Sequence, residues 1–357
     1  MSHEEVILVT GSSGLIGNAV AARLASYYRV VGFDRTPPLR AHSHVYPVQV
    51  DLTSEEDLSR AFKTLLDAHG NRLTSVIHLA AYFDFSGEPN KLYEALTVEG
   101  TRRLLQRLSS LSVEQFIFSS TMLVHAPCMP GQFITEDSPL DPRWDYPISK
   151  VKAEQVIHSE RGSIPAVSLR IGGVYTDHCN CLPISHQIQR IYERWFTSRV
   201  FPGPISHGQA FVHLDDLVDA CIATVDRRKS LPPECAILIG EPEPLTYDEL
   251  QHQFARLLHN EDWETTQIPK VVAKTGAWVQ NTISMGEEPF IKPWMIDYSD
   301  DHYALDITRA QRLLGWTPQH SLRTTLLKMI AALQADPENW YREHHLDFEA
   351  VPDSLPA

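Results

Sequence analysis

The sequence predicts an α/β fold in which helices cover both faces of a parallel sheet and a smaller lobe follows. In the first half of the chain, short β-rich runs alternate with longer amphipathic stretches. Several of these runs lack polar alternation, which is typical of strands buried on both faces. From about Tyr175 prolines divide the chain into shorter pieces. We therefore expect a doubly wound sheet followed by a less regular C-terminal lobe.

Hydrophobic periodicity gives the expected elements in order. The candidate strands are residues 6–10, 30–33, 45–50, 75–78, 115–119 and 166–170. The candidate helices of the first half are residues 15–28, 54–68, 91–111 and 146–160. The later candidate helices are residues 182–197, 214–226, 246–258 and 322–333. A short apolar run at 236–239 is expected to return to the sheet.

Composition and charge exclude several classes of protein. The 357 residues suffice for one large unit or two packed lobes. A formal charge of −14 opposes a nucleic-acid or anionic-membrane partner. The start of the chain carries acidic residues where a signal peptide needs basic ones, and no run of 18 apolar residues occurs. We therefore expect a cytoplasmic protein with no nucleic-acid or membrane partner.

The five cysteines form no paired motif, which fits reduced thiols in a cytosolic protein. His178, Cys179 and Cys181 resemble one corner of a metal site, but no second half with ligand spacing follows them. No metal is therefore expected.

A glycine loop follows the first strand directly and opens the first helix. Gly11, Gly14 and Gly17 provide a tight turn, bare backbone for a pyrophosphate, and close packing of the helix on the strand. The helix N-terminus adds N–H groups and the positive end of its dipole. This context predicts a dinucleotide site rather than an ordinary turn.

Asp34 ends the second strand, where a carboxylate can bind the ribose hydroxyls and repel a 2′-phosphate. NAD is therefore favoured over NADP, although Arg35 could pair with that phosphate. Asp51 and Leu52 follow the third strand and are expected near the adenine edge. Asp51 could equally serve the N-terminus of the helix that starts near Ser54.

Tyr146 and Lys150 open a predicted helix, where a spacing of four places both side chains on one face. A tyrosine has a normal pKa near 10, so it needs a neighbouring cation to act as a base at neutral pH. Alone, such a pair is more often an exposed surface pair.

The order of motifs changes this interpretation. A TGxxGxxG loop is followed by an acid after the second strand, by His78-Leu-Ala-Ala81, by Ser119-Ser-Thr121, and then by the YxxxK pair. Over about residues 5–335 the chain resembles the extended short-chain dehydrogenase/reductase family, also called the NAD-dependent epimerase/dehydratase family. The resemblance implies a Rossmann domain at 1–174, a mainly substrate-binding lobe at 175–340 with 205–240 returning to the sheet, and a tail at 341–357.

The resemblance also implies roles for individual residues. Thr121 is expected to hydrogen-bond the reacting oxygen, Tyr146 to transfer the proton, and Lys150 to hold the ribose and bias the tyrosine. The residues expected to contact the cofactor are Gly11, Ser13, Gly14, Leu15, Ile16, Gly17, Asp34, Arg35, Asp51, Leu52, Leu79, Ala80, Ala81, Ser119, Tyr146 and Lys150. The expected substrate contacts are Tyr82, Phe83, Thr121 and Gly173.

Four departures from the family pattern narrow the chemistry. Met122 and Leu123 replace the acid and base of the nucleotide-sugar dehydratases, so elimination of water is not expected. Gly173 and Gln209 stand where sugar-nucleotide members tend to carry diphosphate-binding Asn and Arg. Arginines at 190, 194 and 199 could replace these missing diphosphate contacts. Thr97 replaces an Asn that supports the nicotinamide side in many members.

The segment Tyr82-Phe83-Asp-Phe85 suits an apolar or ring-shaped ligand, although its rings could instead belong to the core. Reversible hydride transfer between NAD and a secondary alcohol of a partly apolar small molecule is the leading hypothesis. The alternatives are a nucleotide-sugar 4-epimerase with tightly bound NAD and a non-catalytic protein that senses NAD(H). A homodimer formed through residues 91–111 and 146–160 is also expected from the family.

Overall fold

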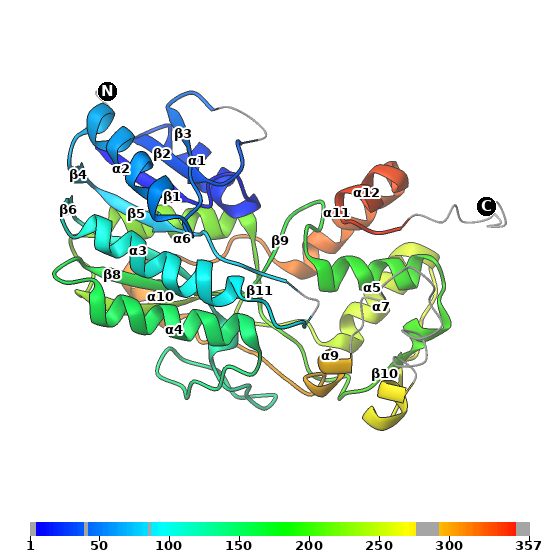
Figure 1. Ribbon diagram of the computed structural model, residues 1–357. Helices are drawn as coiled ribbons and strands as arrows, with labels where there is room; N and C mark the ends of the chain where they lie inside the picture. Colours follow the sequence, from blue (N-terminus) through cyan, green and yellow to red (C-terminus); the bar gives the residue numbers. More distant parts are fainter. Residues whose placement is uncertain (1–4, 39–41, 85–86, 276–292, 348–357) are drawn as a thin grey trace.

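The computed structural model describes residues 5–38, 42–84, 87–275 and 293–347 (Figure 1). Phe85 and the end of the tail after Asp347 lie outside these described residues. Within them, no helix is both long and apolar enough to cross a membrane.

The centre of the molecule is a seven-stranded sheet in which every neighbouring pair is parallel. Its strands are β1 (Val6–Thr10), β2 (Arg29–Asp34), β3 (Val45–Gln49), β5 (Ser75–His78), β7 (Phe116–Thr121), β8 (Ala166–Ile171) and β12 (Glu234–Ile239). Their order is β12-β8-β7-β5-β1-β2-β3, so the direction of winding reverses between β1 and β5. Ligands of open α/β sheets bind at the carboxyl ends of the strands beside such a reversal. The predicted Rossmann-type fold class is confirmed.

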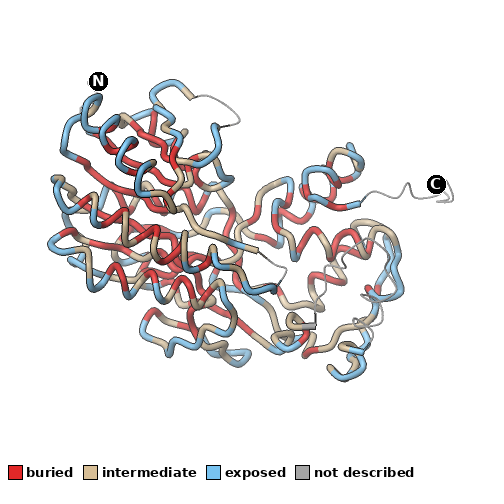
Figure 2. Tube along the Cα trace, in the orientation of Figure 1, coloured by how far each residue is buried: buried red, intermediate tan, exposed pale blue. Residues whose placement is uncertain are grey.

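Helices cover both faces of this sheet (Figure 1). The helices α1 (Leu15–Leu24), α6 (Leu214–Asp226) and α10 (Thr308–Leu314) lie on one face, and α2 (Glu55–His69), α3 (Glu99–Leu108) and α4 (Asp145–Glu160) lie on the other. Along β1, Ile7 and Val9 pack with the first set, and Val6 and Leu8 pack with the second. The central strands of the sheet are therefore buried on both faces, as the red strands in Figure 2 show, whereas the edge strand β3 is partly exposed.

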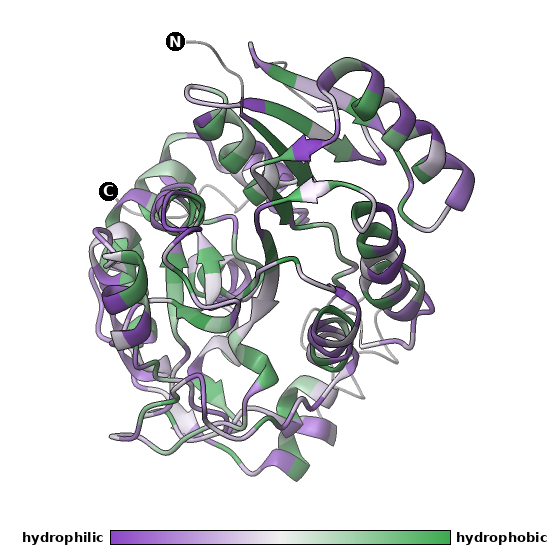
Figure 3. Cartoon of the chain, turned by 90° about the vertical axis from the view of Figure 1, so that its left-hand side faces the viewer, coloured by the Kyte–Doolittle hydropathy of each residue, from purple (hydrophilic) through white to green (hydrophobic). Residues whose placement is uncertain are grey.

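A second lobe has its own hydrophobic cluster, which includes Trp263, Trp340 and Phe254. Its helices are α5 (Leu182–Tyr192), α7 (Tyr247–His259), α11 (Leu322–Ala335) and α12 (Pro337–Glu343), with the short α9 (Pro293–Asp297) below them in Figure 1. Three small parallel pairs complete the structure: β4 (Arg72–Leu73) with β6 (Ser112–Val113), β9 (Gly173–Tyr175) with β11 (Phe211–His213), and β10 (Val200–Phe201) with β13 (Thr266–Gln267). In Figure 3 the central strands are mostly green, for hydrophobic residues, and the outer helices alternate between green and the purple of hydrophilic residues.

Most predicted elements appear near their expected bounds, but the helix expected at 15–28 ends at Leu24, and α9, α10 and the short paired strands were not predicted. Three further differences are informative. The helix expected at 91–111 begins as a π-helix, η1 (Tyr93–Val98), before α3. The helix expected at 182–197 ends at Tyr192, because Arg194 adopts a left-handed φ of 57°. The periodicity did not predict α12, whose Trp340 and Tyr341 are buried in the second lobe.

Candidate active site

The three glycines of the loop after β1 have different surroundings. A Cβ on Gly17 would collide with the carbonyl oxygen of Gly11, and a Cβ on Gly11 would lie 2.8 Å from the backbone nitrogen of Ala80. Gly11 also has a positive φ of 70°. A Cβ on Gly14 would meet only the Gly11 carbonyl oxygen, at 3.5 Å. Gly11 and Gly17 are therefore required by the fold, whereas Gly14 leaves room for a ligand.

Helix α1 starts directly at this opening. Gly14 is its N-cap residue, and no side chain caps the first-turn N–H groups. Leu15 is 47% exposed, and Ile16 is partly buried against the core. Uncapped N–H groups beside a residue without a side chain suit a pyrophosphate, so this loop fits a dinucleotide.

Asp34 joins the glycine loop to the end of β2. Its carboxylate accepts the backbone N–H groups of Ser13 and Thr36, at 2.9 and 3.0 Å, and the hydroxyl of Thr36 at 3.2 Å. The Ser13 hydroxyl donates to the carbonyl of Thr36 at 2.8 Å. These bonds hold a carboxylate at the position where the adenosine ribose of a dinucleotide is expected.

The adenine side of the expected cofactor site contains polar residues in a surface hollow and one apolar residue of the core. Arg35, Gln49 and Asp51 line one surface hollow together with Asp57 and Arg60. The carboxylate of Asp51 also accepts the N–H and hydroxyl of Thr53, at 2.8 and 2.7 Å. Leu52 is 4% exposed and packs in the core cluster of α2 and α3.

His78 fixes the loop that follows β5. It lies between the hydroxyls of Thr10 and Thr101, at 2.6 and 2.9 Å. Because the Thr101 hydroxyl already donates to the carbonyl of Thr97, it can only accept from His78, so Nε2 carries the proton and Nδ1 accepts from Thr10. Burial lowers the pKa of His78 to about 3, with a contribution from Lys150, so the ring is neutral.

The same loop contains Leu79, Ala80, Ala81 and Tyr82. The N–H of Ala80 donates to the Thr10 hydroxyl at 3.3 Å, which holds the loop against the end of β1. The N–H of Tyr82 donates to the hydroxyl of Thr97 at 3.1 Å. Thr97 belongs to the π-helix η1, and short π-helical segments are frequent at functional sites. Thr97 therefore supports the backbone of this loop.

Thr121, Tyr146 and Lys150 lie at the carboxyl end of β7 and in the first turns of α4. Thr121 is the last residue of β7 and is 5% exposed. Burial raises the pKa of Tyr146, and a hydrogen bond from the side chain of Thr121 opposes that shift. The structure thus brings the hydroxyl groups of Thr121 and Tyr146 into contact.

Lys150 is almost fully buried, at 2% exposed. Its ammonium group donates to the carbonyl of Ser119 at 2.5 Å and lies 5.7 Å from the ring centre of Tyr146. Burial lowers its pKa to about 7, while Glu154 acts in the opposite direction. The direct hydrogen bond of Lys150 is therefore with Ser119 and not with Tyr146.

A buried polar network supports this end of α4. Glu154 accepts the hydroxyl of Ser120 at 2.5 Å and pairs with the guanidinium of Arg170 at 2.7 Å. Arg170 also donates to the carbonyl of Glu136 at 2.9 Å. Because the carboxylate and the guanidinium satisfy each other and their neighbours, the network fixes α4 against β7 and β8.

The structure also shows the surroundings of the residues that depart from the family pattern. Met122 is buried, and the backbone N–H of Leu123 donates to the Thr121 hydroxyl at 3.3 Å. Both side chains are apolar, so neither can act as an acid or a base. A Cβ on Gly173 would lie 2.5 Å from the ring of Phe211, so a glycine is needed where β9 packs on β11. The backbone of Gln209 pairs with that of Tyr303 in an isolated parallel β-bridge.

Two of the three arginines that could compensate for the missing diphosphate contacts have other partners. Arg194 pairs with Glu261 at 3.0 Å, and the guanidinium of Arg199 lies 4.1 Å above the ring of Trp263. Arg190 donates its Nε–H to the carbonyl of His186, at the long distance of 3.4 Å. Arg190 is therefore the member of this set with the weakest engagement.

Two tryptophans near Tyr146 were not assigned to the site from the sequence. The ring of Trp144 lies 5.5 Å from that of Tyr146, and Trp294 of the second lobe lies 5.1 Å from Trp144. Phe83, which was assigned to the substrate, lies 4.7 Å from Tyr146. The position of Trp144 two residues before Tyr146 was an available signal, whereas nothing in the sequence links Trp294 to this place.

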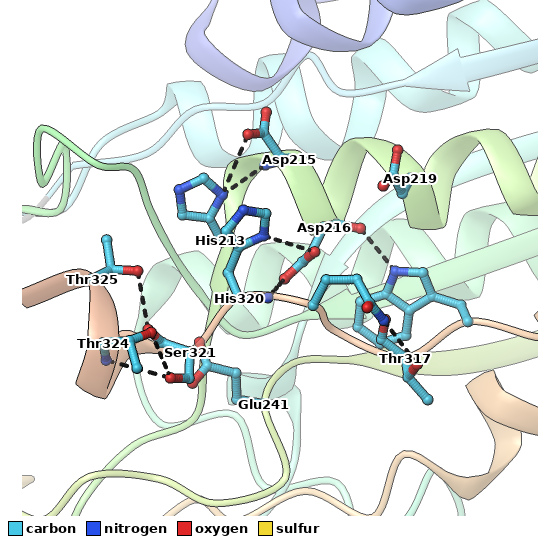
Figure 4. A network of polar contacts seen from close by, with 12 residues as sticks. His213, Asp215, Asp216, Asp219, Glu241, Thr317, His320, Ser321, Thr324 and Thr325 are labelled. Atoms are coloured by element: carbon cyan, nitrogen blue, oxygen red, sulfur yellow. Dashed lines mark hydrogen bonds and ion pairs between the residues drawn. The ribbon is translucent and has the colours of Figure 1, made fainter. Parts of the chain in front are cut away.

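One group of side chains in the described part of the chain gathers enough donor atoms to hold a metal: His213, Asp215 and His320 (Figure 4). However, the two imidazole rings stack at 4.1 Å with an interplanar angle of 19°. An ion cannot lie in the planes of both stacked rings, as metal–imidazole bonds require. Nδ1 of His213 already accepts the N–H of Asp215 at 3.2 Å, so His213 caps α6.

The cysteine corner suggested by the sequence is also unsuited to a metal. Cys179 and Cys181 are buried, and burial raises the pKa of both thiols, that of Cys181 to about 12. His178 is exposed. Protonated thiols in an apolar cluster are packing residues, because the thiolate is the metal ligand.

Comparison with known proteins gives a family and a set of relatives. Residues 7–240 match the model of the NAD dependent epimerase/dehydratase family. A dTDP-6-deoxy-L-talose 4-dehydrogenase (NAD(P)(+)) from Kitasatospora kifunensis is 25% identical over 93% of this chain and 96% of its own length. An uncharacterized UDP-glucose epimerase from Bacillus subtilis is 29% identical over 92% of this chain and 98% of its own length.

Solved structures share the fold. A UDP-glucuronic acid 4-epimerase from Bacillus cereus, in complex with UDP-glucuronic acid and NAD, superposes with a TM-score of 0.69 at 22% identity, over 92% of this chain and 99% of its own. A dTDP-glucose 4,6-dehydratase from Bacillus anthracis in complex with NAD gives 0.70 at 20% identity, over 95% and 99%.

Proposed function

The chain belongs to the NAD-dependent epimerase/dehydratase family, and from this premise we propose that it transfers hydride reversibly between NAD and a secondary alcohol carbon of a ring-shaped small molecule. The observation that carries the proposal is the contact of Thr121 with Tyr146 at the carboxyl end of the sheet. Since the family is one of enzymes, the alternative of a non-catalytic sensor is set aside.

The chain's own residues supply the proton chemistry. The Thr121 hydroxyl holds the oxygen of the alcohol, and Tyr146 takes the alcohol proton at its phenolic oxygen as the carbonyl forms. When bound, oxidised NAD supplies the hydride acceptor and a positive charge beside Tyr146. That charge favours the phenolate, which burial alone disfavours. Lys150 orders the ribose side of the site from its position on the Ser119 carbonyl.

The dinucleotide would lie across the reversal between β1 and β5. Gly14 and the N-terminus of α1 would bind the pyrophosphate, and Asp34 would bind the adenosine ribose. The loop from Leu79 to Ala81, which His78 and Thr97 hold in place, would contact the nicotinamide side.

A 4-epimerase is the second candidate, because several relatives carry that activity in their names. It would oxidise and then re-reduce one carbon with NAD held throughout. Dehydration is disfavoured, because Met122 and Leu123 provide neither an acid nor a base beside Thr121. Stoichiometric NAD in the purified protein, with no net NADH formed during turnover, would favour the epimerase over the dehydrogenase.

The proposal is tested by replacing Tyr146 with Phe. Tyr146→Phe should reduce turnover of sugar and cyclic-alcohol substrates by at least a hundredfold, while NAD binds with unchanged affinity. Tyr27→Phe is the matched control, because Tyr27 is 65% exposed. Turnover that survives in Tyr146→Phe would refute the assignment.

Three wider expectations belong to this proposal. We propose that residues 1–174 form the NAD-binding domain and that the substrate lobe lies mainly within 175–340. We also propose a homodimer formed through α3 and α4, which lie side by side on one face of the sheet (Figure 1) and are joined by the Arg102–Glu160 ion pair at 2.6 Å. A cytoplasmic location fits the absence of a paired-cysteine framework among the five free cysteines.

A further inference from the structure

A set of aromatic rings from both lobes borders the phenol of Tyr146. We call Phe83, Trp144 and Trp294 the aromatic wall. Phe83 meets the ring of Tyr146 edge-on at 4.7 Å, and Trp144 lies 5.5 Å from the same ring. Trp294 continues the row at 5.1 Å from Trp144. These spacings lie in the range in which aromatic rings attract one another.

The wall joins three segments that are far apart in the sequence. Phe83 comes from the loop after β5, Trp144 is the N-cap residue of α4, and Trp294 lies in α9. The loop of Phe83 approaches α9 so closely that a Cβ on Gly87 would collide with the indole nitrogen of Trp294. Gly87 has a φ of 75°, a conformation that favours glycine. The wall is therefore a specific junction of both lobes.

Part of the wall is open to a ligand. Phe83 is 48% exposed although it lies against the tyrosine expected to move the proton, and Trp144 and Trp294 are only partly buried. A ligand that covers Phe83 would remove this exposed apolar surface from water, which favours binding. A ligand that reaches Tyr146 from this side must pass along the wall.

Three cations near the wall, in the part of the chain that the structure describes, are paired with acids. The ion pairs are Arg143 with Asp141 and Asp301, Lys270 with Asp300, and Lys274 with Asp297. A phosphate placed against the wall would have to displace one of these carboxylates. An uncharged ring with C–H groups on one face avoids that cost, because the negative face of an aromatic ring attracts such groups.

We propose that the aromatic wall binds the C–H face of the substrate's reacting ring and that Phe83 and Trp294 determine specificity for it. The inference rests on the proposed function, since it names the substrate surface of the same site. The shared chemistry is a saturated ring that carries a secondary alcohol, as in a pyranose. Such a ring can arrive as a neutral glycoside or as the sugar of a nucleotide diphosphate.

Binding, rather than turnover, tests the inference. Methyl α-D-glucopyranoside and UDP-glucose are titrated into the full chain saturated with NAD, and binding is followed by tryptophan fluorescence and by calorimetry. Phe83→Leu and Trp294→Leu keep an apolar side chain but remove the ring, so they should weaken binding of the ring probes about three- to tenfold. The affinity for NAD should not change.

Phe196→Leu and Trp195→Leu are the matched controls, because both residues lie in the second lobe and are 81% and 39% exposed. They should leave binding unchanged, and Phe83→Tyr and Trp294→Phe should restore it. Binding of only one probe identifies the source of the ring and still supports the inference. Equal affinity in the wall variants and the wild type, or no binding of either probe, overturns it.

The two proposals fail in different ways. A Tyr146→Phe protein that still turns over its substrate would refute the proposed function, whatever the wall variants do. If the wild type is active but the Phe83 and Trp294 variants bind the ring probes with wild-type affinity, only the role of the wall is refuted.

Discussion

The ammonium group of Lys150 donates a hydrogen bond of 2.5 Å to the main-chain carbonyl of Ser119, from a position that is 2% exposed. This contact ties the first turns of α4 to the end of β7. It also holds a titratable group where water cannot stabilise its charge, and burial lowers its pKa to about 7. The same residue therefore links the architecture of the site to the stability of the fold.

This burial should make stability depend on pH. Burial lowers the pKa of Lys150 from its ordinary value of 10.5 to about 7 in the folded chain. Between these two pH values the unfolded chain therefore binds more protons than the folded chain. The free energy of unfolding should then rise with pH across this window, with a slope of up to about 1.4 kcal/mol per pH unit from this group. Below pH 7 the cost of burying the charge is fully present.

Lys150→Met removes this titration. Relative to the variant, the wild type should gain stability as the pH rises from 7 to 10.5, measured by urea unfolding at several pH values. Lys152→Met on the same helix is the control, because it removes only an exposed ion pair with Glu94 and keeps Lys150, so its stability should follow that of the wild type across this pH range. A constant difference between wild type and Lys150→Met would contradict the buried-charge explanation.

The fold could be predicted because its signals are local. The strands 6–10 and 75–78 and the helix 214–226 match the expected ranges, since continuous apolar runs and helical spacing repeat within each segment. The return of residues 236–239 to the sheet was also expected, and β12 pairs with β8 there. The helix at 337–343 was missed because its buried aromatic residues are stabilised by α11 and α5, not by a pattern of its own.

The glycines of the cofactor loop should separate folding from binding. Gly17→Ala introduces a methyl group into the carbonyl oxygen of Gly11, so it should lower the melting temperature markedly and abolish NAD binding. Gly14→Ala meets only one atom, at 3.5 Å, so it should fold normally and bind NAD at least tenfold more weakly. Thermal unfolding and NAD titration check both. Wild-type affinity in Gly14→Ala would argue against a pyrophosphate at this position.

The site could be predicted only in part. Thr121, Tyr146 and Lys150 follow from motif order, and the structure places Thr121 against Tyr146. The position of Trp294 depends on how the second lobe meets the loop at Gly87, about two hundred residues earlier, and no sequence pattern encodes that contact. Leu52 was assigned to the cofactor from its place after a strand; it is 4% exposed, and its contact with the cofactor stays a prediction.

Asp34 should control the choice between NAD and NADP. Asp34→Ser removes the negative charge that opposes a 2′-phosphate and leaves Arg35 beside it, so the ratio of NADP to NAD affinity should rise at least tenfold. The serine can still accept one of the N–H groups of Ser13 and Thr36, which keeps the loop folded. Affinities measured for both cofactors test this, with Asp67→Ser as the control, because Asp67 is exposed on α2. An unchanged ratio would place the discriminating charge elsewhere.

Asp216 should be the residue of α6 whose carboxylate contributes most to joining the lobes (Figure 4). It is 1% exposed and accepts two hydrogen bonds from His320, from the backbone N–H at 2.9 Å and from Nδ1 at 3.0 Å. Asp216→Asn places an amide against one of these donors and removes the charge that attracts the imidazole. We expect a loss of about 2 kcal/mol in the free energy of unfolding, measured in urea.

Asp219→Asn provides the matched comparison, because Asp219 is an aspartate of the same helix, one turn away from Asp216. Asp219 pairs with Arg23 at 3.0 Å, and both side chains are about half exposed, so water replaces the lost contact. This variant should change the free energy of unfolding by less than about 0.5 kcal/mol. Equal effects of the two substitutions would mean that the buried contact with His320 does not hold the lobes together more strongly than a surface ion pair does.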